Sequence, residues 1–153
     1  LVAPLVLSPS GSLDDSVRYF PTVTSLLKKM WSGADGRYSV TLGQPPFSPE
    51  WVAGMFMLFR SSDYFRLGGF DEKFFLYYED VDICVRAWKA GMRVLVCPSV
   101  SVVHDARRDS HRSLRHLRWH LTSMARYFFR HWGRLPRLPD QRSSTASFSG
   151  GAK

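Results

Sequence analysis

The sequence has little cysteine and no long hydrophobic run. Its two cysteines, Cys84 and Cys97, are too few for a disulfide framework, which favours a reducing compartment such as the cytosol. The longest apolar stretch, residues 51–59, is far shorter than the roughly 20 residues that span a bilayer. We therefore exclude a disulfide-bonded secreted module and expect no transmembrane segment.

Phosphate-binding and metal-binding motifs are also scarce. The sequence contains no glycine-rich phosphate loop, and an Asp-x-Asp pattern occurs only at Asp80-Val81-Asp82. This segment is expected to be helical, and side chains two positions apart on a helix do not face each other. A metal ion shared by Asp80 and Asp82 is therefore not expected. Instead, Asp82 is predicted to pair with Arg86 on a solvated helix face.

Hydrophobic patterning predicts an α/β fold with a mixed sheet and flanking helices. Strands are expected at residues 2–7, 51–60, 92–97 and 100–104, and helices at residues 21–30, 61–67 and 80–90, followed by a long amphipathic C-terminal helix. With 44% hydrophobic content, one domain over residues 1–135 is expected. Residues 136–153 are predicted to form a disordered tail.

The acidic residues concentrate in one aromatic-rich segment, residues 71–82, in a chain whose net charge is +8. Glu79 and Asp80 fall at the predicted N-terminus of a helix, where free N–H groups stabilise negative charge. One interpretation is an acidic helix cap. The other is a catalytic base in a cleft, because aromatic surroundings raise a carboxylate's pKa while the helix end lowers it.

Several short motifs follow one another from residue 51 to residue 104. They are Trp51-Val-Ala-Gly54, Gly68-Gly69-Phe70-Asp71-Glu72, Glu79-Asp80-Val81-Asp82, Ala90-Gly91, Pro98 and Val102-Val103-His104. Together they resemble the C-terminal half of the catalytic domain of a family 2 glycosyltransferase, in particular its rhamnosyltransferase-like branch. The resemblance implies an α/β domain of the GT-A type, which is Rossmann-like.

The resemblance also implies roles for individual residues. Asp80 corresponds to the general base that deprotonates the acceptor hydroxyl for an inverting transfer from a nucleotide-sugar, and Glu79 to a residue that orients the acceptor or the base. Sugar and acceptor contacts are expected from five residues: Trp51, Gly54, Gly69, Asp71 and Glu72. The donor sugar is expected to be rhamnose, and the acceptor a cell-surface glycan or a lipid-linked precursor.

A divalent metal, Mg²⁺ or Mn²⁺, is expected in the complete enzyme. In the resembling enzymes a histidine at the place of His104 completes the metal site with Asp-x-Asp carboxylates from the preceding, nucleotide-binding half. Arg107 and Arg108 are candidates for the donor diphosphate, because guanidinium groups match phosphate oxygens. The alternative is that both arginines are solvated. Since the chain begins at Leu1 without that half, we expect a C-terminal fragment that transfers no sugar alone.

The C-terminal helix, expected over residues 112–130, carries much of the positive charge. One apolar stripe is predicted to lie in the core: Leu114, Leu117, Leu121, Met124 and Phe128. The remaining faces are rich in arginine and aromatic residues, which favours an anionic membrane surface. A cytoplasmic protein at the inner face of the cell membrane is therefore expected. His116 and His120 have a spacing that can bind zinc, but no further ligands accompany them.

Two alternatives remain open. The chain is either a non-catalytic basic module for a membrane or nucleic acid, or an inactive remnant of a glycosyltransferase. The acidic segment argues against nucleic acid as a partner, because such modules gain affinity from phosphate contacts and have little use for clustered carboxylates.

Overall fold

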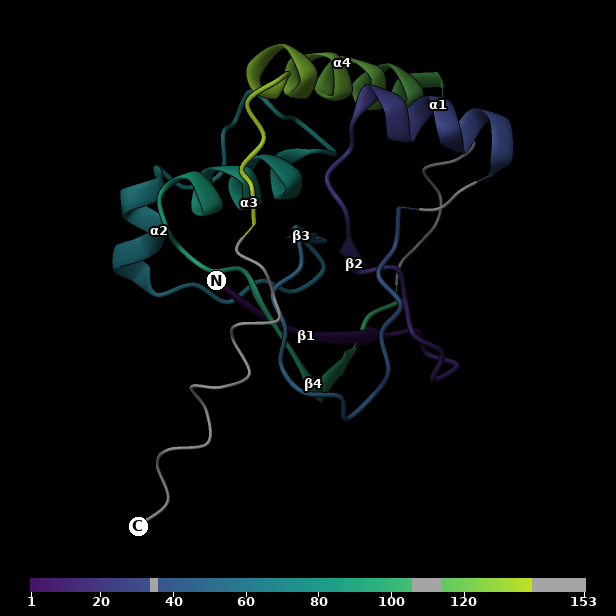
Figure 1. Cartoon of the computed structure of the whole chain (residues 1–153), viewed down its shortest axis with the longest axis vertical. Helices are drawn as coiled ribbons and strands as arrows, with labels where there is room; N and C mark the ends of the chain where they lie inside the picture. Colours follow the sequence, from purple (N-terminus) through teal and green to yellow (C-terminus); the bar gives the residue numbers. More distant parts are fainter. Residues whose placement is uncertain (34–35, 106–113, 139–153) are drawn as a thin grey trace.

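The computed structural model describes residues 1–33, 36–105 and 114–138, so Arg107, Arg108 and residues 139–153 of the predicted tail lie outside the described residues. The elements, in chain order, are β1 (Val2–Leu7), β2 (Val17–Arg18), α1 (Val23–Ser32), β3 (Trp51–Val52), α2 (Ser61–Leu67), α3 (Glu79–Lys89), β4 (Leu95–Val103) and α4 (Leu114–His131) (Figure 1). The predicted mixture of α and β structure is confirmed.

The strands form two small sheets rather than the single mixed sheet that was expected. β1 pairs with β4 in parallel, and β2 pairs with β3 antiparallel. The two predicted strands at 92–97 and 100–104 are one strand, β4, whose register with β1 shifts between Pro4 and Leu5, opposite Pro98. A proline lacks the N–H that would continue the hydrogen-bond ladder, so the irregularity in the pairing occurs at the prolines.

The predicted strand at residues 51–60 is wrong beyond its first two residues. Only Trp51–Val52 pairs as a strand, and the chain then turns. The backbone N–H of Gly54 donates to the Asp80 carboxylate at 2.9 Å instead of to a neighbouring strand. The apolar run therefore bends towards α3, and only Leu58 returns to the sheet, through a single bridge to Val2.

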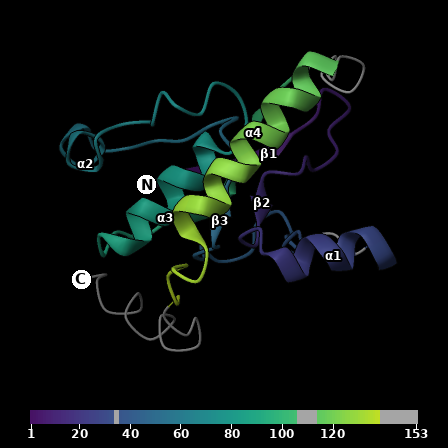
Figure 2. The same ribbon diagram turned by 90° about the horizontal axis from the view of Figure 1, so that it is seen from above.

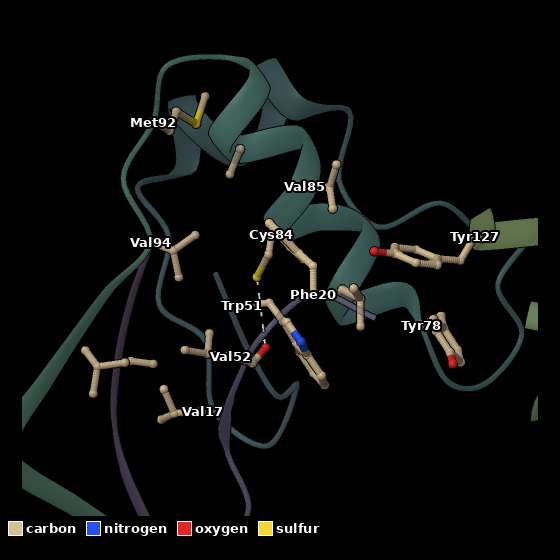
Figure 3. Packing of buried hydrophobic residues seen from close by; sticks show 14 of the residues in the cluster. Val17, Phe20, Trp51, Val52, Tyr78, Cys84, Val85, Met92, Val94 and Tyr127 are labelled. Atoms are coloured by element: carbon tan, nitrogen blue, oxygen red, sulfur yellow. Dashed lines mark hydrogen bonds between the residues drawn. The ribbon is translucent and has the colours of Figure 1, made fainter. Parts of the chain in front are cut away.

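Helix α3 is the centre of the core. Its residues Val81, Cys84 and Val85 are at most 3% exposed, as the 3.6-residue pattern predicted. They pack against β3 and against Tyr127 of α4 (Figure 3). Cys84 is buried and reduced, its Sγ directed at the carbonyl of Val52, and Cys97 is also a free thiol. The prediction that neither cysteine forms a disulfide is confirmed.

Helix α4 crosses above α3, and α1 lies to one side of α4 (Figures 1 and 2). The predicted burial of its apolar stripe is wrong for the N-terminal half, where Leu114 is 87% exposed and Leu117 and Leu121 are 54% and 48% exposed. The buried face is polar and aromatic instead: Ser123, Tyr127 and His131.

Hydrogen bonds explain why this face of α4 is inward. Ser123 Oγ donates to the carbonyl of Leu76 at 2.8 Å, and the Tyr127 hydroxyl donates to the carbonyl of Pro21 at 3.2 Å. Buried hydroxyls need such partners, and leucines on the opposite side cannot reach them. In the described part of the chain, no helix combines the length and the apolarity needed to cross a membrane.

Candidate functional site

Helix α3 begins after two consecutive tyrosines in the left-handed backbone region. Tyr77 and Tyr78 have φ angles of 68° and 67°, and they are the only described non-glycine residues with positive φ. Each such residue typically costs ~1–3 kcal/mol and persists only where its surroundings hold it. Tyr78 is held by burial, since it is only 8% exposed, and by packing against Tyr127, whose ring centroid lies 5.3 Å from that of Tyr78. This turn places Glu79 and Asp80 in the first turn of α3.

Asp80 is half-buried, and both of its carboxylate oxygens accept backbone hydrogen bonds. Oδ2 accepts from Gly54 N at 2.9 Å and Oδ1 from Val81 N at 2.8 Å. Burial raises the pKa of Asp80 above its ordinary value of 3.8, and these two N–H donors oppose the rise. Since each oxygen keeps a further lone pair, the carboxylate can still accept a proton from a ligand hydroxyl.

Glu79 lies beside it with one oxygen unused. Its Oε2 is buried and has no hydrogen-bond partner among the described residues. Burial raises the pKa of Glu79, and the negative charge of Asp80 raises it further. A buried carboxylate oxygen without a partner is unfavourable by ~1–3 kcal/mol, so it is a natural acceptor for a ligand hydroxyl.

These two carboxylates line a cavity of about 520 Å³ between α1, the start of α3 and α4. Its lining residues are Arg18, Tyr19, Pro21, Ser25, Leu26, Lys28, Lys29, Gly36, Trp51, Tyr77, Tyr78, Glu79, Asp80, Val81 and His120. A volume of this size falls in the range of small-molecule sites. The cavity thus combines aromatic walls with a few polar groups, as ligand sites do.

Of the predicted site residues, Trp51, Glu79 and Asp80 meet at this cavity. Trp51 is 8% exposed, and its indole N–H donates to the carbonyl of Tyr19 at 2.8 Å, which fixes the ring in the wall. Gly54 lies behind Asp80: a Cβ placed there would be 3.5 Å from the Asp80 Cβ. The glycine therefore allows the close approach through which its N–H reaches the carboxylate.

Gly69, Asp71 and Glu72 do not line the cavity. Gly69 has a φ of 68°, and its carbonyl accepts from Arg86 at 2.8 Å. Asp71 accepts from the N–H of Lys73 and forms an ion pair with Arg130 at 2.5 Å. The Lys73 N–H is the larger cause of the lowered pKa of Asp71, and Arg130 adds to it. Their contact with a sugar stays a prediction, and the geometry favours a structural role for Gly69 and Asp71.

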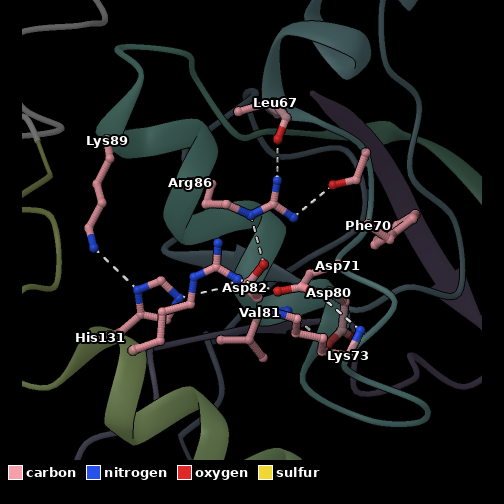
Figure 4. Close-up of polar contacts among 12 residues, drawn as sticks. Leu67, Phe70, Asp71, Lys73, Asp80, Val81, Asp82, Arg86, Lys89 and His131 are labelled. Atoms are coloured by element: carbon pink, nitrogen blue, oxygen red, sulfur yellow. Dashed lines mark hydrogen bonds and ion pairs between the residues drawn. The ribbon is translucent and has the colours of Figure 1, made fainter.

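Asp82 lies in a different environment from Asp80. Its side chain is fully buried, and it accepts from Arg86 Nε at 2.7 Å and from His131 Nε2 at 2.8 Å (Figure 4). The predicted pairing of Asp82 with Arg86 is confirmed, but the prediction that this pair is solvated is wrong, because α4 covers it. Asp80 and Asp82 therefore have separate hydrogen-bond partners.

The network around Asp82 joins α4 to the loop before α3. Arg86 also donates to the carbonyls of Leu67 and Gly69, at 2.5 and 2.8 Å. Lys89 Nζ contacts His131 Nδ1 at 3.2 Å, and because an ammonium can only donate, Nδ1 is the acceptor and Nε2–H points to Asp82. Burial raises the pKa of Asp82, but the hydrogen bonds from His131 and Arg86 outweigh burial and lower it overall.

The predicted metal ligand, His104, follows the end of β4. Its Nδ1 is buried without a hydrogen-bond partner in the described chain, which suits a metal ligand. However, the described residues contain no group of three or more His, Cys, Asp or Glu side chains that could hold a metal ion. His104 alone does not make a metal site.

The cavity also includes residues that sequence reasoning assigned elsewhere or overlooked. His120 packs edge-on against Tyr77 and Tyr78, with ring centroids 5.2 and 5.4 Å away, while His116 packs on Trp119. The two histidines therefore serve different contacts, and the zinc alternative has no support. Lys28 and Lys29 lie in the predicted helix at 21–30, but no local pattern connects that helix with Asp80.

Comparison with known proteins shows the family to which the chain belongs. Residues 40–116 match the family model described as the N-terminal domain of galactosyltransferase. The rhamnosyltransferase WbbL of Escherichia coli (strain K12) is 36% identical over 125 residues, which cover 76% of this chain and 45% of that protein. The N-acetylglucosaminyl-diphospho-decaprenol L-rhamnosyltransferase of Mycobacterium tuberculosis (strain ATCC 25618 / H37Rv) is 32% identical over 161 residues, covering 95% of this chain and 51% of that protein.

The chain spans about half the length of these curated relatives. No solved structure matches it. The matched family model covers the segment that contains Trp51, Gly54, Glu79 and Asp80, the same residues that meet at the cavity or directly behind it. The chain belongs to the family 2 glycosyltransferases, in their rhamnosyltransferase-like branch.

Proposed function

We propose that the protein transfers rhamnose from a nucleotide-sugar to a hydroxyl of a lipid-linked glycan precursor, with inversion at the anomeric carbon. The observation that carries this proposal is the Glu79–Asp80 pair, held at the start of α3 and exposed to a cavity of about 520 Å³. The names of the relatives support rhamnose as the sugar, and one of those names supports a diphospho-lipid acceptor.

Asp80 acts as the general base in this proposal. The acceptor oxygen forms a bond to the anomeric carbon while the bond between that carbon and the nucleoside diphosphate breaks, and the acceptor proton passes to Asp80. A base for this step must be ionised yet basic near neutral pH, and burial moves the pKa of Asp80 in that direction. Its hydrogen bond from Gly54 fixes the carboxylate against the wall of the cavity.

Glu79 orients the acceptor. Its free Oε2 accepts a hydrogen bond from a second hydroxyl of the acceptor sugar, which satisfies the buried oxygen. Trp51, in the same wall, contributes apolar surface beside the acceptor sugar. Together they define how the reacting hydroxyl meets Asp80.

The donor side lies outside the described cavity. We propose that the complete enzyme has a GT-A-type domain and a bound Mg²⁺ or Mn²⁺, for which His104 is one ligand. Arg107 and Arg108 are proposed contacts for the donor diphosphate. The metal's chemistry when bound is stabilisation of the leaving diphosphate's negative charge.

The experiment that tests the proposal is a transfer assay with the full-length protein. We expect incorporation of rhamnose from deoxythymidine-diphosphate rhamnose into an N-acetylglucosaminyl-diphospho-lipid acceptor, with the product's anomeric configuration, read by NMR, inverted relative to the donor. Retention of configuration rules out the direct displacement that Asp80 is proposed to assist. Transfer of glucose or galactose in preference to rhamnose contradicts the sugar assignment.

We further propose that the protein is cytoplasmic and peripheral at the inner face of the cell membrane. Arg115 and Arg118 on α4 are exposed, beside Leu117 and Leu121, which are 54% and 48% exposed. Exposed cations next to exposed apolar side chains suit an anionic interface.

Charge reversal on α4 tests the membrane proposal. Each Lys or Arg near an anionic surface contributes ~1 kcal/mol, so Arg115→Glu with Arg118→Glu should reduce co-sedimentation with anionic vesicles strongly. Binding of the wild type should fade as salt rises. Arg60→Glu with Arg93→Glu, also exposed and distant in sequence, is the matched control and should bind nearly as the wild type does. Equal pelleting with neutral vesicles contradicts the proposal.

A further inference from the structure

The cavity is lined by basic residues as well as by its two carboxylates. Lys28 and Lys29 of α1 line it together with Arg18. Arg18 pairs with Asp15 at 3.4 Å. Both lysines are exposed at the cavity's edge, and no ion pair joins either of them to an acidic side chain of the described chain. Lys29 is close enough to His120 that its charge, after burial, lowers the pKa of that histidine. Two cationic side chains therefore line the cavity without an acidic partner among the described residues.

The same helix continues into exposed apolar residues. Leu27, Met30 and Trp31 are 56%, 84% and 94% exposed. Trp31 follows Lys28 and Lys29 by only two to three positions, so the basic rim of the cavity borders an apolar surface. Carboxylates and cations thus line one cavity, and exposed apolar side chains lie on the helix that supplies the cations.

We propose that Lys28 and Lys29 form a subsite for the diphosphate group of a lipid-linked acceptor. This inference rests on the proposed function and adds to it the residues that recognise the acceptor's anionic group. The sugar lies against Glu79 and Asp80, the diphosphate lies at the lysines, and the first part of the lipid passes over Met30 and Trp31. Lysine ammonium groups are suited to this role because they attract phosphate as compact charges from a flexible stem.

The position of the lysines favours the acceptor's diphosphate over that of the donor. They share a cavity with Asp80, whose carboxylate must contact the acceptor hydroxyl. They also share a helix with exposed apolar residues, which a nucleotide does not require but a lipid does. A nucleoside diphosphate and a prenyl diphosphate present the same charged group, so the experiment has to separate the two.

Calorimetric titration of the full-length protein separates these sources. The probes are N-acetylglucosaminyl diphosphate carrying a short prenyl chain, the phosphate-free prenyl glycoside of the same sugar, and deoxythymidine diphosphate. We expect Lys28→Gln with Lys29→Gln to weaken binding of the first probe about tenfold or more, as loss of charge-assisted hydrogen bonds does. Binding of the other two probes should change less than about twofold.

Arg60→Gln with Arg93→Gln is the matched control, because it also removes two positive charges but from exposed positions that do not line the cavity. It should leave all three affinities near those of the wild type. An equal loss for the control pair shows a general charge effect and overturns the subsite. A selective loss for deoxythymidine diphosphate assigns the lysines to the donor and also overturns it. The subsite is also overturned if Lys28→Gln with Lys29→Gln binds the first probe as tightly as the wild type does, or if the wild type does not bind that probe.

Failure of this subsite is distinguishable from failure of the proposed function. The titration reports diphosphate binding without turnover, whereas the transfer assay reports the chemical step. If transfer of rhamnose is observed while the lysine variant binds normally, only the subsite is wrong.

Discussion

Replacement of Asp80 by asparagine is expected to lower kcat by ~10²–10⁴, because loss of a general base has effects of this size. The substitution preserves the shape of the side chain, and an amide oxygen can still accept the hydrogen bond from either Gly54 or Val81. Donor binding should therefore change little. Rates and donor affinity of the full-length enzyme, measured side by side, check this expectation.

The pH profile gives a second readout for the same residue. A base must be deprotonated, so kcat/KM should fall as pH drops through the pKa of Asp80. Burial raises that pKa above 3.8, so the acidic limb should lie at higher pH than that of an ordinary aspartate. Glu79→Gln should reduce the rate less than Asp80→Asn, since it changes orientation rather than proton transfer. If Asp80→Asn keeps more than about a tenth of kcat, Asp80 is only a helix cap.

The sequence alone was sufficient to find the catalytic candidates. The aromatic run before Glu79 and the apolar spacing after Asp80 predicted a helix with two carboxylates at its N-terminus, and α3 confirms this arrangement. The left-handed backbone at Tyr77 and Tyr78 was not predictable, because tyrosine disfavours that region and carries no local signal for it. Only the packing of α4 onto these rings explains why the strain persists.

Long-range contacts explain the remaining differences between the predicted and the observed structure. Residues 51–60 have the composition of a strand, yet one tertiary hydrogen bond, from Gly54 to Asp80, turns the chain after β3. In α4, hydrophobic spacing indicated one buried face, but the helix buries Tyr127 and His131 because their polar atoms find partners at Pro21 and Asp82. Partners so far apart along the chain leave no periodic trace in a single sequence.

These same contacts position the candidate site. Helix α4 holds Tyr78 through Tyr127, and it covers Asp82 through His131. Asp82 lies two residues beyond the proposed base, on the opposite side of the first turn of α3. The side chains of Asp82, Arg86 and His131 do not line the cavity, so this buried network can be tested separately from the chemistry.

Asp82→Asn is expected to destabilise the fold by ~3 kcal/mol, because removal of one partner from a buried ion pair leaves the other charge without compensation. Asp82 is fully buried, and its replacement leaves Arg86, 16% exposed at its side chain, with neutral acceptors in place of a carboxylate. Denaturant unfolding of wild type and variant at pH 7 measures the difference. Asp63→Asn is the matched control, because it removes an exposed pair with Arg66 at 3.7 Å and should change stability by less than ~1 kcal/mol.

The pH dependence of the stability difference between the wild type and Asp82→Asn identifies the charge of Asp82 as its cause. Partners of Asp82 lower its pKa in the folded protein, so its charge stabilises the fold above the unfolded-state value of ~3.9 and this contribution is lost as pH falls through the lower folded pKa. The gap between wild type and Asp82→Asn should therefore be full at pH 7 and narrow below about pH 4. A gap that stays constant down to pH 3 indicates that packing, rather than the buried carboxylate, accounts for the loss. A gap no larger than that of Asp63→Asn at pH 7 shows that the network does not hold α4 onto the start of α3.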